Sequence, residues 1–236
     1  MILNIAGWNL IDWISIVVLV LSVLYGMYRG FISGVLSLAA LVGAIAGSFF
    51  FYPKLAKVLS ENETLVATLL YYTDAASRIG RLDLTLLTVA ETTGNALSAM
   101  LENARLPEAF RRAFLVNFEN AAGEQRVSDV LSRTIVNASI SILSFLICFF
   151  LCYLAALFLI HLISYVFELP VLRHLDSLVG GVFGFIRGWL LLMVLFILVP
   201  IITAVAPVEA ITNLFQTSKL ANWFDSRLIL TILGVG

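Results

Sequence analysis

The stretch Gly26-Met27-Tyr28-Arg29-Gly30 lies between two long apolar runs, and its pattern recurs as Gly184-Phe185-Ile186-Arg187-Gly188. In both copies a glycine recurs at every fourth residue, which places the glycines on one face of a helix. Such a face lets a neighbouring backbone approach closely, and helices associate in this way in lipid, where the hydrophobic effect does not drive them together. We therefore interpret both repeats as helix-packing surfaces, made by Gly26, Gly30, Gly34, Gly180, Gly184 and Gly188.

An arginine stands inside each glycine repeat. A guanidinium group at membrane depth costs about 3 kcal/mol or more unless it is paired or hydrated. Anchoring at the membrane surface explains Arg29 and also Arg173, which lies in another short turn. We expect Asp176 to pair with Arg29, and Arg187 to reach a polar partner inside the helix bundle. The predicted charge cluster consists of Asp12, Arg29, Arg173, Asp176 and Arg187.

The composition identifies an integral membrane protein. Hydrophobic residues make up 61% of the 236 residues and charged residues 12%, and the mean hydropathy is +1.03. Globular proteins are about half apolar and about a quarter charged. The formal net charge is -1, and no face or run concentrates lysine and arginine, so the sequence gives no indication of nucleic-acid binding.

Four apolar runs are long enough to cross a bilayer, which takes about 20 helical residues. They cover residues 11–28, 31–52, 142–167 and 178–205. Only Arg29 and Gly30 separate the first two runs, so these must form a hairpin, and Pro53 is expected to end the second. The predicted fold is all-α: a polytopic membrane protein with four transmembrane helices.

The remaining segments predict helices outside the bilayer. Residues 53–133 carry nine basic and ten acidic side chains among apolar residues at helical spacing, with a helix start predicted at Leu106-Pro107-Glu108. These helices either lie on the membrane surface or pack on one another as a cap. Residues 206–236 are too polar to span and too apolar to remain in water, which favours an interfacial amphipathic helix. The predicted parts are therefore 9–52, 53–133, 134–205 and 206–236.

Small polar residues recur at intervals of three and four just before the third apolar run and into its beginning. They are Thr134, Asn137, Ser141 and Ser144. One interpretation is interhelical hydrogen bonding, worth about 0.6 kcal/mol per contact. The other is one wall of a water-accessible cavity, because polar side chains at membrane depth must face protein or water.

The short loops predict the orientation, because long loops are translocated largely regardless of their charge. The first hairpin turn carries Arg29, the turn between the third and fourth runs carries Arg173, and the amino-terminal tail carries no basic residue. Both turns are therefore expected in the cytoplasm. Both termini and residues 53–133 are expected on the extracytoplasmic side.

No catalytic constellation is evident in the sequence. Ser33 and Gly34 together with His161 faintly suggest an intramembrane serine protease, but the spacing is Gly-x-x-Ser-Gly, and small residues on a helix-packing face explain it. No phosphate-binding glycine loop and no metal-ligand spacing is present. We expect no catalytic residue, no metal and no cofactor.

The first hairpin and the final apolar run carry a family resemblance. Asp12, the turn Gly26-x-x-Arg29-Gly30, and the run from Asp176-Ser177-Leu178-Val179-Gly180-Gly181 to Gly184-x-x-Arg187-Gly188 together resemble the colicin V production protein (CvpA) family. The resemblance covers residues 9–52 and 170–205. It implies a four-span bacterial inner-membrane protein linked to colicin V production, a toxin biosynthesis process, and to envelope integrity. A long segment at 53–133 departs from smaller members, which have a short loop there.

These observations favour a non-enzymatic membrane protein that supports an envelope or secretion process. The expected partners are the lipid bilayer and either further copies of the chain, joined through the glycine repeats, or other envelope proteins. The alternative is a subunit of a small channel or transporter, with Arg187 and the polar residues of the third run lining a pathway.

Overall fold

The computed structural model describes residues 8–73, 79, 85–104, 106–166, 175–205, 215, 217–220 and 233. Every regular element in these residues is a helix. The helices are α1 (Leu10–Ser60), α2 (Glu63–Thr73), α5 (Gly94–Ala104), α6 (Glu108–Glu119), α7 (Val127–Val166), α8 (Leu175–Phe196) and α9 (Leu198–Val205). The predicted helical fold class is confirmed.

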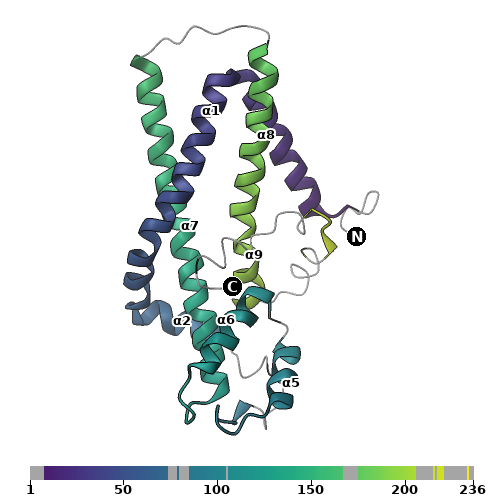
Figure 1. Cartoon of the computed structure of the whole chain (residues 1–236), viewed down its shortest axis with the longest axis vertical. Helices are drawn as coiled ribbons and strands as arrows, with labels where there is room; N and C mark the ends of the chain where they lie inside the picture. Colours follow the sequence, from purple (N-terminus) through teal and green to yellow (C-terminus); the bar gives the residue numbers. More distant parts are fainter. Residues whose placement is uncertain are drawn as a thin grey trace. The chain divides into compact units, whose positions relative to one another are not determined.

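Helix α1 consists of two limbs joined by a sharp bend at Gly30, where the backbone is not helical. Gly30 has a φ of 80°, a conformation that residues with a side chain rarely adopt. Figure 1 shows the chain reversing at this bend, with one limb on either side. The turn predicted between the first two apolar runs therefore lies at the glycine that ends the first Arg-bearing repeat.

The prediction that Pro53 ends the second run is wrong. The helix continues through Pro53 to Ser60. Proline removes one backbone donor and disturbs one turn, but a helix accommodates this by bending when contacts on both sides hold it. The Phe49 and Tyr52 rings both pack on Phe145 just before the proline. Pro53 lies inside the helix rather than at its end.

Three of the described helices are long and apolar enough to cross a membrane. They are Leu10–Ser60, Val127–Leu162 and Ser177–Ile202. The predicted number was four, and the difference arises because both limbs of α1 are joined in one element across the bend at Gly30. Multiple apolar helices confirm the prediction of a multi-pass membrane protein.

The chain divides into two compact units. The first, which we call the membrane unit, contains Met1–Tyr52, Phe145–Phe196 and Thr212–Ser226. The second, which we call the cap unit, contains Pro53–Ser144, Ile197–Ile211 and Arg227–Gly236. Both α1 and α7 contribute residues to each unit.

Within the membrane unit, the two glycine repeats contact each other. A Cβ atom added at Gly26 would collide with the Gly180 carbonyl oxygen and lie 2.9 Å from the Gly184 Cα. A Cβ atom at Gly180 would collide with the Gly26 carbonyl oxygen and lie 2.8 Å from the Gly30 carbonyl carbon. The backbones of α1 and α8 therefore touch directly, as small residues allow in membrane proteins.

The other limb of α1 packs against α7 through larger side chains. The Phe49 and Phe145 rings lie 4.9 Å apart, and a Cβ atom at Gly47 would lie 3.3 Å from the Cys152 sulfur. Phe145 is fully buried. Aromatic contacts of this kind stabilise a fold by about 0.5–1.5 kcal/mol beyond the free energy gained by burying the rings. The membrane unit thus uses glycine contacts at one limb and aromatic contacts at the other.

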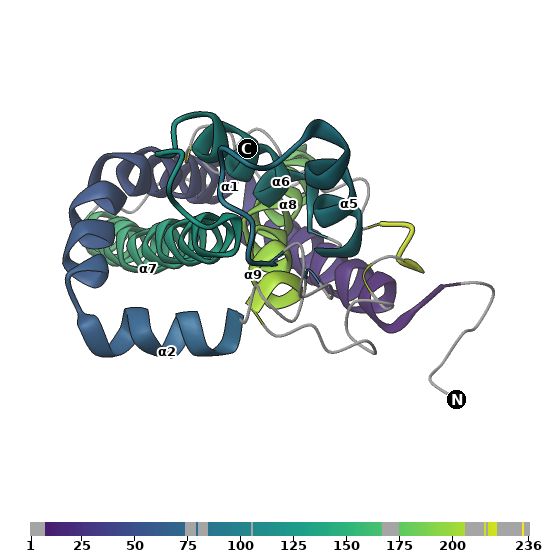
Figure 2. The same cartoon turned by 90° about the horizontal axis from the view of Figure 1, so that it is seen from below.

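The cap unit has a hydrophobic core of its own. Its fully buried side chains include Ile79, Met100, Phe110, Phe114 and Ile135. The α6 helix begins at Glu108, with Pro107 as its N-cap residue, so the predicted helix start is confirmed. Helix α2 contacts α9 (Figure 2). Both arrangements left open for residues 53–133 stay predictions, because helices that share a buried core can also lie on a membrane surface.

Backbone hydrogen bonds fix the beginning of α7 in the cap unit. Val89 N donates to Gln125 O at 2.9 Å, and Val127 N donates to Leu87 O at 3.1 Å. The Ser128 hydroxyl donates to Thr85 O at 3.1 Å. The predicted amphipathic helix at 206–236 lies largely outside the described residues.

The contact between the glycine repeats predicts the effect of adding a side chain. In Gly184→Leu, the new Cβ would meet the Ser22 carbonyl oxygen and lie 3.1 Å from the Val23 Cα, so the two helices must separate. Overpacking costs typically about 1–3 kcal/mol. We expect a lower unfolding midpoint for the purified protein in detergent, measured by circular dichroism.

The matched control for this prediction is Gly43→Leu. Gly43 lies in α1, within a long apolar helix as Gly184 does, but a Cβ atom there meets nothing within 4 Å. Its midpoint should stay close to that of the unmodified protein. Equal midpoints for both variants would show that the glycine contact does not hold the helices together.

Candidate functional site

Arg187 on α8 reaches Ser22 on α1. Its Nη2 and Nε atoms lie 3.2 Å and 3.4 Å from the Ser22 Oγ, which accepts both hydrogen bonds. The Ser22 hydroxyl donates in turn to the Gly184 carbonyl oxygen at 2.7 Å and is buried. A Cβ atom added at Gly188 would lie 2.8 Å from the Ser22 Cβ. The glycine repeat on α8 thus brings the serine close enough to orient the guanidinium group.

The Arg187 guanidinium also lies over the ring of Tyr25. The Arg187 Cζ is 4.8 Å from the ring centroid, and the Cζ of Arg29 is 5.4 Å from the same centroid. Two helices therefore contribute to one polar group in the membrane unit, which we call the arginine cluster: Ser22, Tyr25, Arg29 and Arg187.

The neutral partners of Arg187 are sufficient to hold it in an apolar surrounding. A cation–π contact contributes about 0.5–2 kcal/mol, and a hydrogen bond to a charged group about 1.5–3 kcal/mol. Their sum is of the same order as the cost of about 3 kcal/mol for an arginine at membrane depth. These contacts stabilise the guanidinium without neutralising its charge.

Arg187 was expected to reach a polar partner inside the bundle, with the serine and asparagine residues of the third run as candidates. The structure places Ser22 in that role. Ser22 continues the four-residue spacing of Gly26, Gly30 and Gly34, and Tyr25 precedes Arg29 by one helical turn. Both signals are present in the sequence, but neither residue was selected.

The expected pairing of Asp176 with Arg29 lies outside the described residues. Arg173 and the side chain of Asp176 are not described. Arg29 itself is exposed, next to the bend at Gly30.

Asp12 does not lie near Arg29, a described member of the predicted charge cluster. It begins the first limb of α1, whereas Arg29 ends it, and the 17 residues between them correspond to about 25 Å of helix. The Asn9 Oδ1 accepts from the Ile11 and Asp12 amides, and the Asp12 Oδ2 accepts from the Asn9 amide at 3.0 Å. These reciprocal bonds form a capping box at the beginning of α1.

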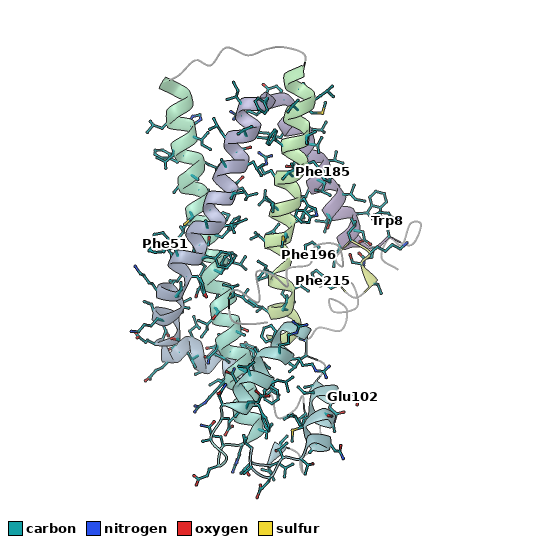
Figure 3. All side chains as sticks on the ribbon, viewed as in Figure 1. Trp8, Phe51, Glu102, Phe185, Phe196 and Phe215 are labelled. Carbon is teal, nitrogen blue, oxygen red and sulfur yellow. The ribbon has the colours of Figure 1, made fainter. Side chains whose placement is uncertain are left out.

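A segment near the carboxyl terminus completes the surroundings of Asp12. The Asp12 Oδ1 accepts from the Ser218 hydroxyl at 2.6 Å and from the Leu220 amide at 2.9 Å. Lys219 lies 6.0 Å from the ring of Trp8, and Phe215 packs on Phe196 with ring centroids 6.2 Å apart (Figure 3). The Asp12 side chain is 0% exposed. Phe215 therefore packs on the end of α8, and residues 217–220 lie against the start of α1.

The small polar residues of α7 do not form one continuous wall. Thr134 is buried, donates to the Val130 carbonyl oxygen at 2.7 Å and accepts from the Asn117 side chain at 3.0 Å. Ser144 is buried and donates to the Ile140 carbonyl oxygen at 2.7 Å. Asn137 is exposed and Ser141 half-buried. The two buried members thus bond within the cap unit.

The described parts of the chain hold no group of three or more histidine, cysteine, aspartate or glutamate side chains that could bind a metal. The arrangement that the structure does provide is cationic. Two guanidinium groups share one aromatic ring, and one of them is kept in place by the hydrogen bonds that it donates to a serine. Groups of this kind bind anions and orient helices.

The docking of residues 215–220 predicts the effect of removing the Asp12 charge. In Asp12→Asn the side chain keeps its size but loses the charged acceptor for Ser218 and Leu220. Hydrogen bonds to charged groups contribute about 1.5–3 kcal/mol, so amide exchange at 218–220 should become faster by roughly tenfold or more. Hydrogen–deuterium exchange with mass spectrometry measures this.

Asp129→Asn is the control, because Asp129 lies in the first turn of α7 and is exposed. It should leave exchange at 218–220 unchanged. Unchanged exchange in Asp12→Asn as well would mean that the carboxylate does not hold this segment.

Comparison with protein families matches residues 11–113 and 120–228 to the colicin V production protein family. The comparisons with curated proteins and with solved structures gave no match. The family match extends beyond the two regions of resemblance, across most of residues 53–133 and into the carboxyl-terminal part that contains Ser218 and Leu220. Since the match covers most of the sequence, this chain belongs to the colicin V production protein family.

Proposed function

We propose that this protein is a non-enzymatic scaffold of the bacterial inner membrane that supports a toxin-production, secretion or envelope process. The observation that carries this proposal is the direct backbone contact between α1 and α8. An added Cβ atom at Gly26, Gly180 or Gly184 would collide with the facing backbone. Helices packed this closely leave no path for a solute between them and favour a fixed framework.

The proposal includes four spans. The limb of α1 before Gly30 has about 20 residues and so reaches about 30 Å, the thickness of the hydrocarbon core. The limb after Gly30 and the helices Val127–Leu162 and Ser177–Ile202 supply the other three. Arg29 beside the bend favours the cytoplasmic side for this turn. The part of the cap unit between the second and third spans, within residues 53–133, and both termini then lie on the extracytoplasmic side.

The cap unit is the part of the scaffold that meets a partner. Its own buried core, with Phe110 and Phe114, supports a stable shape outside the bilayer. Large side chains remain exposed on its helices, among them Tyr71 on α2 and Val116 on α6. We expect another envelope protein to contact this surface.

Self-association was expected through the glycine repeats. In the structure these repeats face each other within one chain. A homo-oligomer would therefore use other surfaces of the membrane unit. Phe50, which is exposed, lies on such a surface.

The alternative function is a subunit of a channel or transporter. The observation in its favour is Arg187, whose hydrogen bonds among the described residues go to a neutral serine. Intramembrane arginines often mark substrate or ion pathways. The polar residues of α7 give this alternative less support, because Thr134 and Ser144 are buried and bond to the carbonyl oxygens of their own helix.

The proposed orientation predicts which side of the membrane the bend faces. Tyr28 is 88% exposed beside the bend, and Tyr71 is exposed on α2 in the cap unit. In a background with Cys148→Ala and Cys152→Ala, a membrane-impermeant maleimide should label Tyr71→Cys in intact spheroplasts. Tyr28→Cys should react only after the membrane is opened. The reverse labelling pattern would invert the topology.

The scaffold proposal predicts protein contacts at the cap unit. Photo-reactive residues at Tyr71 and Val116 should give discrete protein adducts in native membranes, because both side chains are exposed on the unit that we place outside the bilayer. A photo-reactive residue at Phe158, exposed on the membrane unit, is the control and should give lipid adducts. Gel electrophoresis and mass spectrometry of the adducts provide the measurement.

A pathway for solutes would contradict the scaffold proposal. Ser144 is 0% exposed, so Ser144→Cys should resist water-soluble thiol reagents, whereas Tyr71→Cys, which is exposed on α2, should react and serve as the positive control. Labelling of Ser144→Cys, together with solute flux across liposomes containing the purified protein, would favour the channel or transporter.

A further inference from the structure

Arg29 and Arg187 come from different helices and approach the same tyrosine. Their Cζ atoms lie 5.4 Å and 4.8 Å from the Tyr25 ring centroid. Arg29 reaches the ring from one turn further along α1, and Arg187 reaches it from α8. The two Cζ atoms are therefore at most 10.2 Å apart, which brings both guanidinium groups to one end of the membrane unit.

The antiparallel packing of α1 and α8 aims Arg187 towards Arg29. Gly180 lies against Gly26 and Gly30, whereas Gly188 lies against Ser22, so α8 begins beside the bend and runs away from it. Side chains on a helix lean towards its amino terminus. Arg187 therefore extends towards the bend, past Ser22 to Tyr25, which is the behaviour of a long cationic side chain that reaches for the membrane interface.

The cluster has two positive charges and no described carboxylate bonded to them. Among the described residues, the hydrogen bonds of the Arg187 side chain go to Ser22, whose hydroxyl is neutral. A guanidinium carries five N–H donors, and Ser22 engages two of the Arg187 nitrogens. Two like charges around one ring repel each other, and the repulsion is strongest where water is scarce. A shared anion would relieve it and accept the remaining N–H groups.

The position of the cluster favours a phosphate group. Arginine binds phosphate oxygens in a bidentate manner, and tyrosine is enriched where the bilayer meets water. The bend at Gly30 joins two helical limbs, and Tyr28 beside it is exposed. This end of the membrane unit belongs at the level of the lipid headgroups, because the limb before it is about as long as the hydrocarbon core is thick.

We propose that Arg29, Tyr25 and Arg187 form a phosphate-binding site that takes the headgroup of an anionic phospholipid. Ser22 positions the Arg187 guanidinium, and the exposed Arg29 closes the site from the bend. The same phosphate chemistry could be supplied by inorganic phosphate, and the experiment separates the two sources. This site does not depend on whether the protein acts as a scaffold or as a channel subunit.

The test is native mass spectrometry of the full chain in detergent with added phosphatidylglycerol, and in parallel with phosphatidylcholine. The unmodified protein should retain phosphatidylglycerol in preference to phosphatidylcholine. Arg29→Gln and Arg187→Gln should each reduce this retention by roughly tenfold, since each removes one charged partner of the phosphate. Inorganic phosphate at millimolar concentration should leave the retained lipid unchanged.

Arg133→Gln is the matched control, because Arg133 is exposed on α7 and belongs to the cap unit. It removes the same charge and should retain lipid like the unmodified protein. Arg29→Gln keeps the test valid if Arg187→Gln fails to fold, because the Arg29 side chain is exposed.

Two outcomes would overturn the proposal. Equal retention of phosphatidylglycerol by the unmodified protein and by Arg29→Gln would exclude the site. Displacement of the lipid by inorganic phosphate would exclude the lipid headgroup as its ligand.

Discussion

The close approach of two backbones is the constraint on which the membrane unit depends. Gly26 on α1 faces Gly180 and Gly184 on α8 so closely that a Cβ atom added at any of the three would collide with the backbone of the opposite helix. Lipid offers no hydrophobic gain for bringing these helices together, so their association depends on packing and hydrogen bonds. The bond from the Ser22 hydroxyl to the Gly184 carbonyl oxygen is one of these.

The same contact determines the chemistry beside it. Because Gly188 lies against Ser22, the next residue towards the amino terminus of α8, Arg187, meets the Ser22 hydroxyl and the Tyr25 ring. A bulkier residue at Gly188 would move the guanidinium away from the Ser22 hydroxyl and from the Tyr25 ring. The close helix packing in this unit therefore also determines the position of the Arg187 charge.

Regular patterns made part of this structure predictable from the sequence. Long apolar runs and the four-residue glycine spacing depend on local geometry, and they indicated membrane helices, a turn near Gly30 and the faces on which the glycines lie. The spacing shows which residues share a helix face, but it does not show which helix packs against that face. The contact between the two repeats could therefore not be predicted from the sequence. Pro53 was misjudged because the local loss of a hydrogen bond says nothing about the contacts that keep a helix continuous.

Long-range polar contacts were beyond the reach of local patterns. Asp12 was grouped with distant arginines because it is charged and lies in an apolar run, yet its partners are a serine hydroxyl and a backbone amide more than 200 positions away in the chain. Ser22 was overlooked because a single serine in an apolar run usually bonds to its own helix. Both cases concern a neighbour that only the folded chain supplies.

The separation between Asp12 and Ser218 has a consequence for biogenesis. The carboxylate is synthesised with α1, but the hydroxyl that donates to it is synthesised 206 residues later. Until then its partners are water and the capping amide of Asn9. The polar contacts that cover this end of α1 can therefore form only after residues 218 and 220 have left the ribosome.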